Sequence, residues 1–228
     1  AFILLYRGGK SEAARGVEAF PGIGAAEMAK KGAVVAAPDL RGLGEMSPKP
    51  GGELKEMRNY TEYELSTSAS IMGRPLAGMR AYDVTRIVDY LEGRRDIVPS
   101  RISIAAGGSM AHIALLAAAL DTRIAADPDH SGVYLHNTPV TFFVTSIPDS
   151  FSMDFYVPRI LDHADMPSLA GLVAPRNLVI AGGTTAEMQP ADTRTLKNSF
   201  VLGISTYKRM DAEAAMTVDP EARPSSIR

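Results

Sequence analysis

Short apolar runs that alternate with helical segments constrain the fold of this 228-residue chain more than any other feature. Runs of four or five residues, closed by glycine, proline or a charge, are typical of strands buried on both faces. Such strands are predicted at residues 2–6, 33–37, 102–106, 123–126 and 177–181, with a further one at 214–218. Strands that alternate with helices form βαβ units. The sequence therefore predicts one α/β domain over residues 1–228, with a doubly wound, mostly parallel sheet flanked by helices.

The helices that should cover this sheet differ in how much of their surface is apolar. Residues 79–93 form the clearest amphipathic helix, with one apolar face and charged residues, Arg80 among them, between its members. That face consists of Val84, Ile87, Val88 and Leu91. Residues 110–120 are apolar on all sides, which indicates a buried helix. The other predicted helices cover residues 25–31 and 191–210. Residues 41–73 and 127–158 lack a sustained period, so we expect irregular segments there, with at most a short helix in the first.

Composition removes several classes of function. Lys and Arg number 24 against 26 Asp and Glu, so a net charge of -2 gives no electrostatic footprint for nucleic acid or acidic lipid. The chain has no cysteine, and none of its four histidines pairs with another at the i, i+4 spacing of a helical zinc site. No stretch approaches the ~20 consecutive apolar residues of a membrane span. We therefore expect a soluble protein without a metal, a cofactor, a nucleic-acid partner or a membrane, in a compartment that the sequence leaves open.

Four runs of sequence, in a fixed order, are similar to those of a known family. Residues 39–45 (DLRGLGE) are followed by 73–84 (GRPLAGMRAYDV), 165–169 (DMPSL) and 174–180 (APRNLVI). These runs resemble the α/β-hydrolase fold and, more narrowly, the acetyl xylan esterase-like carboxylesterases. Several linked motifs in family order make a chance similarity improbable.

The resemblance implies how the chain aligns with that family. The strand at residues 2–6 would be the family's third, and it would end in the oxyanion loop at Arg7, Gly8 and Gly9. The family's first strands and its terminal histidine loop would lie outside this chain, which would then be truncated at both ends. A sheet without its first strands would leave the strand at residues 2–6 as an unpaired edge, and unpaired edges promote association.

The nucleophile of the family is the central serine of a G-x-S-x-G motif, at a sharp turn between a strand and a helix. The resemblance places Gly107, Gly108, Ser109 and Met110 at this turn, with Gly108 in the position of the serine. Ser109 follows one residue later, where it either caps the next helix or acts as a displaced nucleophile. A phosphate-binding loop is a poorer interpretation, because Gly107 and Gly108 lack the third spaced glycine of such loops.

The acid of the family would follow the strand at residues 177–181, and its position falls at Thr185. Threonine supplies no carboxylate. Glu187 and Asp192 are the nearest acids, and each also suits the N-terminus of the following helix, where the helix dipole favours a negative charge.

The base of the family is a histidine after the last strand, yet no histidine follows His163. The resemblance gives His163 a surface or packing role. His112 is predicted to be a core histidine. We expect His130 in a polar turn at the same end of the sheet as Gly108, facing solvent.

Two functional hypotheses follow from these substitutions. The first is a degenerate hydrolase domain that serves as a structural or carbohydrate-binding partner of an active domain, such as a second hydrolase domain in the same parent protein. The second is an acetyl esterase that uses Ser109 as its nucleophile and cleaves an acetylated carbohydrate or small ester. The missing nucleophile and acid favour the first, because the loss of one triad member already costs several orders of magnitude in rate.

Overall fold

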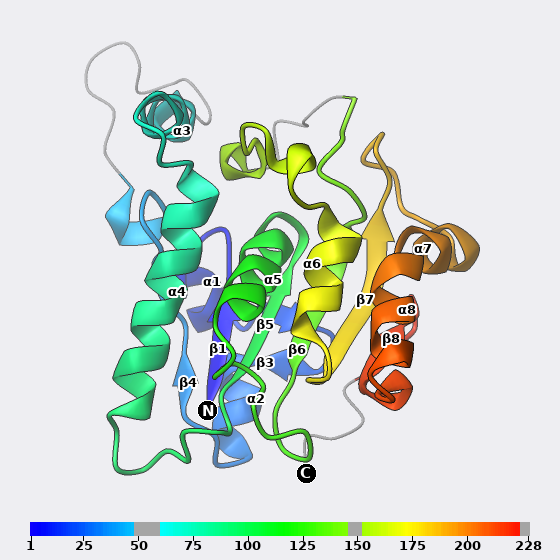
Figure 1. Cartoon of the computed structure of the whole chain (residues 1–228). Coiled ribbons are helices and arrows are strands. Elements are labelled where there is room, and N and C mark those ends of the chain that lie inside the picture. Colours follow the sequence, from blue (N-terminus) through cyan, green and yellow to red (C-terminus); the bar gives the residue numbers. More distant parts are fainter. Residues whose placement is uncertain (48–59, 146–151, 224–228) are drawn as a thin grey trace.

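The computed structural model describes residues 1–47, 60–145 and 152–223. Its centre is a six-stranded sheet with the order β4-β1-β5-β6-β7-β8, in which all neighbouring strands are parallel (Figure 1). The strands are β1 (Phe2–Leu5), β4 (Val35–Ala36), β5 (Ser103–Gly107), β6 (Val133–Pro139), β7 (Leu178–Thr184) and β8 (Met216–Val218). A separate antiparallel hairpin consists of β2 (Glu18–Phe20) and β3 (Ile23–Gly24). The predicted parallel α/β sheet is confirmed.

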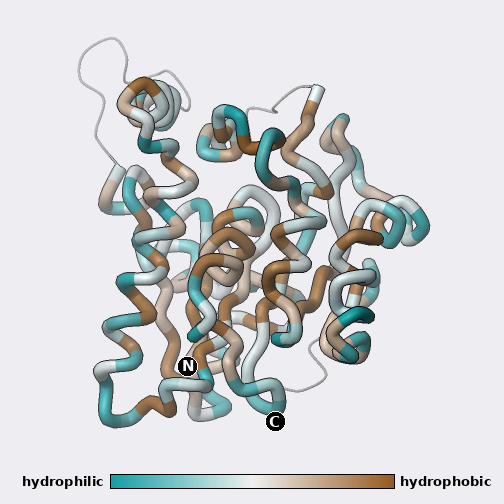
Figure 2. The backbone as a smooth tube through the Cα atoms, in the orientation of Figure 1, coloured by the Kyte–Doolittle hydropathy of each residue, from teal (hydrophilic) through white to brown (hydrophobic). Residues whose placement is uncertain are grey.

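Helices cover both faces of the sheet. They are α1 (Lys10–Ala14), α2 (Ala25–Lys30), α3 (Tyr60–Ile71), α4 (Leu76–Glu92), α5 (Ala111–Leu120), α6 (Met166–Val173), α7 (Thr193–Ser199) and α8 (Val201–Arg209). Short 3₁₀ turns are η1 (Gly44–Met46), η3 (Gly108–Met110), η4 (Met153–Phe155), η5 (Ile160–Asp162) and η6 (Glu213–Ala215). One apolar core lies beneath α4, α5, α6 and α8, and a second lies between the sheet and α1, α2 and the hairpin. Successive strand residues alternate between the two cores, as Ile3 and Leu4 do, and Figure 2 shows hydrophobic residues concentrated along the strands and the inner faces of the helices.

The predicted amphipathic helix is α4. Val84, Val88 and Leu91 are buried as expected, and Ile87 is half-buried. Arg80, however, is fully buried rather than exposed. It lies on the same helical face, four residues before Val84, so it enters the protein interior beside the apolar side chains.

The predicted strand at residues 123–126 is wrong. Ile124 makes a single isolated bridge to Ile102, and Ala125 turns the chain with a φ of 60°. The strand that lies between β5 and β7 is β6 instead, in a segment predicted to be irregular. Polar residues such as His136 at the carboxyl end of β6 interrupt its apolar run, which concealed the strand in the sequence.

The helix predictions need three corrections. The segment 41–73 contains α3, a helix of 12 residues rather than a short one. The predicted helix at 191–210 is divided into α7 and α8, because Phe200 leaves the helical conformation between them. Residues 11–24, where no element is predicted above, contain part of α1 and the β2–β3 hairpin.

The strand β1 is not an edge. It pairs with β4 on one side and with β5 on the other, so the expected unpaired edge at residues 2–6 is wrong. The edges of the sheet are β4 and β8. The extent of the domain beyond this chain stays a prediction.

Candidate functional site

Because the six strands are parallel, their carboxyl ends meet at one edge of the sheet, where site residues of α/β proteins gather. We call this the carboxyl edge and define it by the loops that follow Leu5, Gly107, Pro139 and Thr184. In Figure 1 the strands point toward the top of the view, so the carboxyl edge lies at the same end of the molecule as α3.

The turn between β5 and α5 is the centre of the carboxyl edge. Gly107 ends β5, and Gly108 begins the 3₁₀ turn that leads into α5. Gly108 has a φ of +53°, in the left-handed region that residues with a side chain adopt at a cost. A Cβ built on Gly108 would meet no atom within 4 Å. The turn thus has a left-handed conformation that would strain any other residue, at a position that faces open space and carries no side chain.

Ser109 is half-buried in this turn. It does not form the cap that the sequence allowed, because the N-cap residue of α5 is Met110 and no side-chain cap hydrogen bond is present. No hydrogen bond between Ser109 and a histidine is found among the described residues. Its role as a displaced nucleophile stays a prediction.

The loop after β1, the predicted oxyanion loop, is shaped by Asp39. The Asp39 carboxylate accepts hydrogen bonds from the backbone N–H groups of Lys10, at 2.8 Å, and Glu45, at 3.2 Å. Gly9 has a φ of +63°, and a Cβ there would lie 1.9 Å from Asp39 Oδ1. This close approach requires glycine. Gly8 precedes it, and the Arg7 side chain pairs with Glu62 of α3 at 3.1 Å.

The loop after β7 is closed by its own backbone. Thr185 donates its N–H to the carbonyl of Gln189 at 2.8 Å, and its hydroxyl accepts from the N–H of Glu187 at 3.3 Å. Glu187 is exposed. Asp192 is the N-cap of α7 and accepts from the N–H of Thr195 at 2.7 Å, which lowers the pKa of Asp192. The one carboxylate that this loop orders is therefore engaged with a helix terminus.

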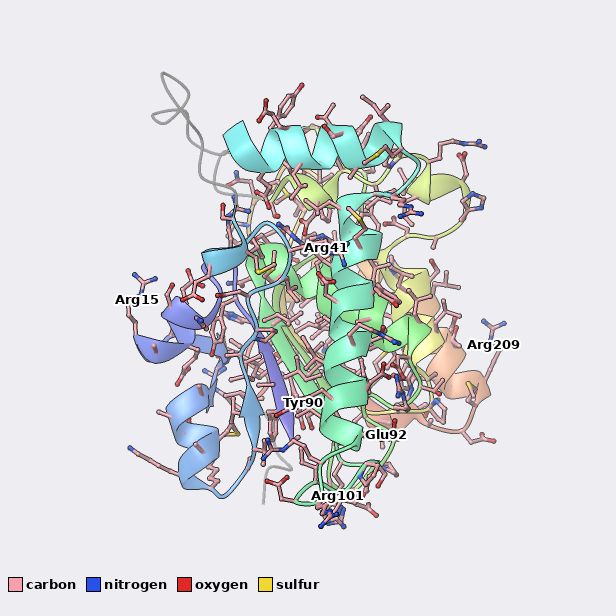
Figure 3. The ribbon with its side chains drawn as sticks, turned by 90° about the vertical axis from the view of Figure 1, so that its left-hand side faces the viewer. Arg15, Arg41, Tyr90, Glu92, Arg101 and Arg209 are labelled. Atoms are coloured by element: carbon pink, nitrogen blue, oxygen red, sulfur yellow. The ribbon has the colours of Figure 1, made fainter. Side chains whose placement is uncertain are left out.

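His130 lies at the opposite end of the sheet from Gly108, so its predicted place is wrong. Its Nδ1 is 3.1 Å from Asp127, which in turn pairs with Arg101 just before β5. Figure 3 shows Arg101 at the end of the molecule away from α3, whereas Arg41 lies beneath α3. The error follows from the missing strand at residues 123–126, because His130 precedes its strand, β6, instead of following one.

Two other histidines, His112 and His136, lie near the carboxyl edge. His163, in contrast, is exposed, as a surface role requires. His136, for which no role was predicted, lies on β6 as the register partner of Gly107. Its ring meets Phe20 edge-on at 6.2 Å. Burial, with a smaller effect of Arg223, lowers the pKa of His136. His112 is fully buried in the first turn of α5.

His112 belongs to a buried polar network that the sequence did not reveal. At its centre the Arg80 guanidinium donates to Glu62 at 2.9 Å, to the hydroxyl of Ser152 at 2.9 Å and to Asp154. His112 Nε2 lies 3.2 Å from the other Asp154 oxygen. Although burial opposes its ionisation, the neighbouring His112 and Arg80 hold the pKa of Asp154 well below its usual range.

This network fixes the two segments that overlie the carboxyl edge. Glu62 comes from α3 and Asp154 from η4, while Arg80 belongs to α4 in the body of the domain. Arg80 Nε also donates to the Arg41 carbonyl at 3.0 Å. The position of Arg80 on the apolar face of α4 is the signal that would have found it, because an arginine there must meet buried acids.

The described residues offer no metal site, because no three His, Asp or Glu side chains among them are placed to hold an ion. Nor is any helix in the described ranges long and apolar enough to cross a membrane.

No family model matches the chain. It is 29% identical over 140 residues to the protein named putative hydrolase YtaP of Bacillus subtilis (strain 168), a match that covers 60% of this chain and 45% of that protein.

Two solved structures share the fold. A putative acetyl xylan esterase from Bacteroides fragilis superposes with a TM-score of 0.70 at 17% identity, over 99% of this chain and 59% of that one. The glucuronoyl esterase catalytic domain from Hypocrea jecorina superposes with a TM-score of 0.51 at 16% identity, over 98% of this chain and 62% of that one. The chain thus spans about half the length of the curated relative and about three fifths of each esterase structure. The resemblance is confirmed at the level of the fold, because the chain has the α/β-hydrolase fold of these two structures.

Proposed function

We propose that the carboxyl edge around Gly108 is an ester-hydrolase site that keeps its frame but has lost its nucleophile. In this proposal the chain binds an acyl or acetylated carbohydrate group without cleaving it, as a partner of an active domain. The observation that carries the proposal is the backbone of Gly108, which keeps a positive φ with open space around the missing side chain.

The chemistry of ester cleavage explains why this observation matters. A serine hydrolase attacks the ester carbonyl with a hydroxyl oxygen, and backbone N–H groups then stabilise the oxyanion. A glycine at the elbow retains the turn and its N–H groups but has no atom that could attack. The acid position carries Thr185, and the nearby Asp192 is engaged as a helix cap.

The names of similar proteins suggest the class of ligand. The two solved structures described above are esterases by name, one of them a putative acetyl xylan esterase. An acetylated sugar is therefore the ligand that we propose for the carboxyl edge, and a second hydrolase domain remains the proposed partner.

Hydrolysis assays test the loss of chemistry. The purified chain, incubated with p-nitrophenyl acetate or acetylated xylotriose, should release acetate no faster than buffer alone. Ser109→Ala is the matched variant. If the chain hydrolyses either ester and Ser109→Ala abolishes that activity, the alternative of a displaced nucleophile is correct and the proposal is wrong.

Binding assays test the retained frame. Acetylated xylotriose should raise the melting temperature of the chain in a dose-dependent way. The variant Gly108→Leu places a large side chain in the open space at the elbow and should remove the shift. An equal shift in both proteins would show that the ligand binds elsewhere.

A further inference from the structure

A groove on the outer face of α4 lies beside the loop that follows β4 and encloses about 330 Å³. This volume is at the lower end of the range of ligand sites, roughly 300–1,000 Å³, so the groove suits a small molecule. Figure 3 shows α4 at the front of the molecule, with Arg41 beside its upper half. The lining consists of two arginines, a glycine and three apolar or aromatic side chains, namely Arg41, Arg74, Pro75, Gly78, Met79 and Tyr82.

Gly78, in the middle of this lining, is a glycine that the described residues do not require. It belongs to the first turn of α4, where glycine weakens a helix relative to alanine. A Cβ on Gly78 would meet no atom within 4 Å, and its φ is not positive. Gly16, Gly32 and Gly73 have similar open space, but each has a positive φ that accounts for the glycine. Gly78 leaves a gap among the side chains of α4, through which a ligand can approach the backbone.

The charged groups around the groove leave one positive charge uncompensated. Arg41 is fixed and neutralised by Asp83, which accepts from its Nε at 2.8 Å and from its backbone N–H at 3.2 Å. Arg86, one turn beyond the groove, pairs with Asp89 at 2.8 Å. Arg74 is exposed, and its side chain has no hydrogen bond or ion pair with any other described residue. The guanidinium of Arg74 is therefore free to bind an anion.

The rest of the lining suits a flat apolar group. Tyr82 is 55% exposed, and the Arg86 guanidinium lies over its ring at 4.8 Å from the ring centre, which restrains the ring. Met79 is half-buried beside it. An aromatic ring and a thioether both pack favourably on another aromatic ring.

We propose that this groove binds a small aromatic carboxylate. The carboxylate forms charge-assisted hydrogen bonds with the Arg74 guanidinium, and the ring lies over Gly78 against Met79 and Tyr82. A single uncompensated charge matches a monoanion better than a phosphate dianion. The groove contains none of the residues around Gly108, so this inference does not rest on the proposed function.

Titration of the whole chain with benzoate, followed by ligand-observed NMR or calorimetry, tests the inference. Benzoate should bind with a Kd on the order of 1 mM, as expected for so small a ligand. Benzamide keeps the ring but has no charge, and acetate keeps the charge but has no ring. Each should therefore bind more weakly than benzoate by about tenfold or more.

Two substitutions in the groove should weaken benzoate binding without unfolding the chain. Arg74→Gln removes the free charge from an exposed side chain. Gly78→Leu fills the gap with a residue that favours a helix more than glycine does. Each should weaken binding by about tenfold or more, and circular dichroism of each variant verifies folding.

Matched control variants lie outside the groove. Arg209→Gln removes an exposed arginine at the end of α8, which Figure 3 shows far from Arg41. Tyr90→Ala matches Tyr82→Ala, because Tyr90 lies on the same helix, is 63% exposed and has the Arg94 guanidinium 5.8 Å from its ring centre. Tyr82→Ala should weaken benzoate binding, and both controls should leave it unchanged.

Each outcome decides the question. Binding that is weakened by Arg74→Gln, Gly78→Leu and Tyr82→Ala but not by the two controls supports the inference. No binding at roughly 10 mM benzoate, or equal binding by all variants, overturns it. Equal binding of benzamide and benzoate would refute the role of the free guanidinium, and tighter binding of phenyl phosphate than of benzoate would contradict a site for a monoanion.

Discussion

Removal of the Asp154 carboxylate should destabilise the domain strongly. Asp154 is 1% exposed, and its two oxygens face Arg80 and His112. The substitution Asp154→Ala would leave the Arg80 guanidinium buried with one carboxylate partner fewer. Breaking a buried ion pair costs about 3–5 kcal/mol. Since Glu62 still binds Arg80 at 2.9 Å, we expect the lower end, about 3 kcal/mol.

Urea denaturation at neutral pH measures this loss. With a slope of about 2 kcal/mol per M, a loss of about 3 kcal/mol moves the midpoint by about 1.5 M. Asp162→Ala is the matched control, because Asp162 forms an exposed pair with Arg159 that is worth at most about 1 kcal/mol.

A second substitution separates lost pairing from lost packing. The double variant Arg80→Met/Asp154→Leu removes the buried guanidinium together with its acid. It should therefore be more stable than Asp154→Ala alone. A midpoint for Asp154→Ala within about 0.5 M of the unsubstituted chain would refute the account of the network.

The remaining predictions concern four single positions. Gly108→Ala should lower the free energy of unfolding by about 1–2 kcal/mol, because φ is positive but no atom lies near the new Cβ. Gly9→Ala should lower it by about 3 kcal/mol or more, because its Cβ would also meet Asp39. Comparing the unfolding curves of the two variants checks both values. Asp165→Ala should cost about 2 kcal/mol in the same assay, because Asp165 caps α6 and also accepts from the N–H of Phe142 at 2.7 Å. For His136 the folded pKa is lowered, so the unfolded chain binds more protons and stability should fall as pH drops below about 6.5; His136→Gln should flatten this dependence in unfolding curves measured across that pH range.

Apolar patterning was sufficient to predict most strands of the sheet, because the central strands are buried on both faces. The strands β1, β5 and β7 read as continuous apolar runs, and the structure has them parallel. Patterning failed at β6, whose carboxyl end carries His136, Asn137 and Thr138. It also failed at residues 123–126, where an apolar run forms a turn with Ala125 at positive φ.

The candidate site was likewise predictable from the sequence only in part. Local motifs place Gly108 at the turn between strand and helix, because that turn depends on residues adjacent in sequence. The network of Glu62, Arg80 and Asp154 joins residues 18 and 74 positions apart, and no local pattern links them. An arginine on the apolar face of α4 was its one local sign.

Covalent labelling tests most directly the claim that this elbow has lost its nucleophile. The intact chain would be incubated with a fluorophosphonate probe beside an active serine esterase as the positive control, and digested for peptide mass spectrometry. The account predicts a labelled serine in the control enzyme and no adduct on the peptide that contains Gly108 and Ser109. An adduct on Ser109 that disappears in Ser109→Ala would contradict it.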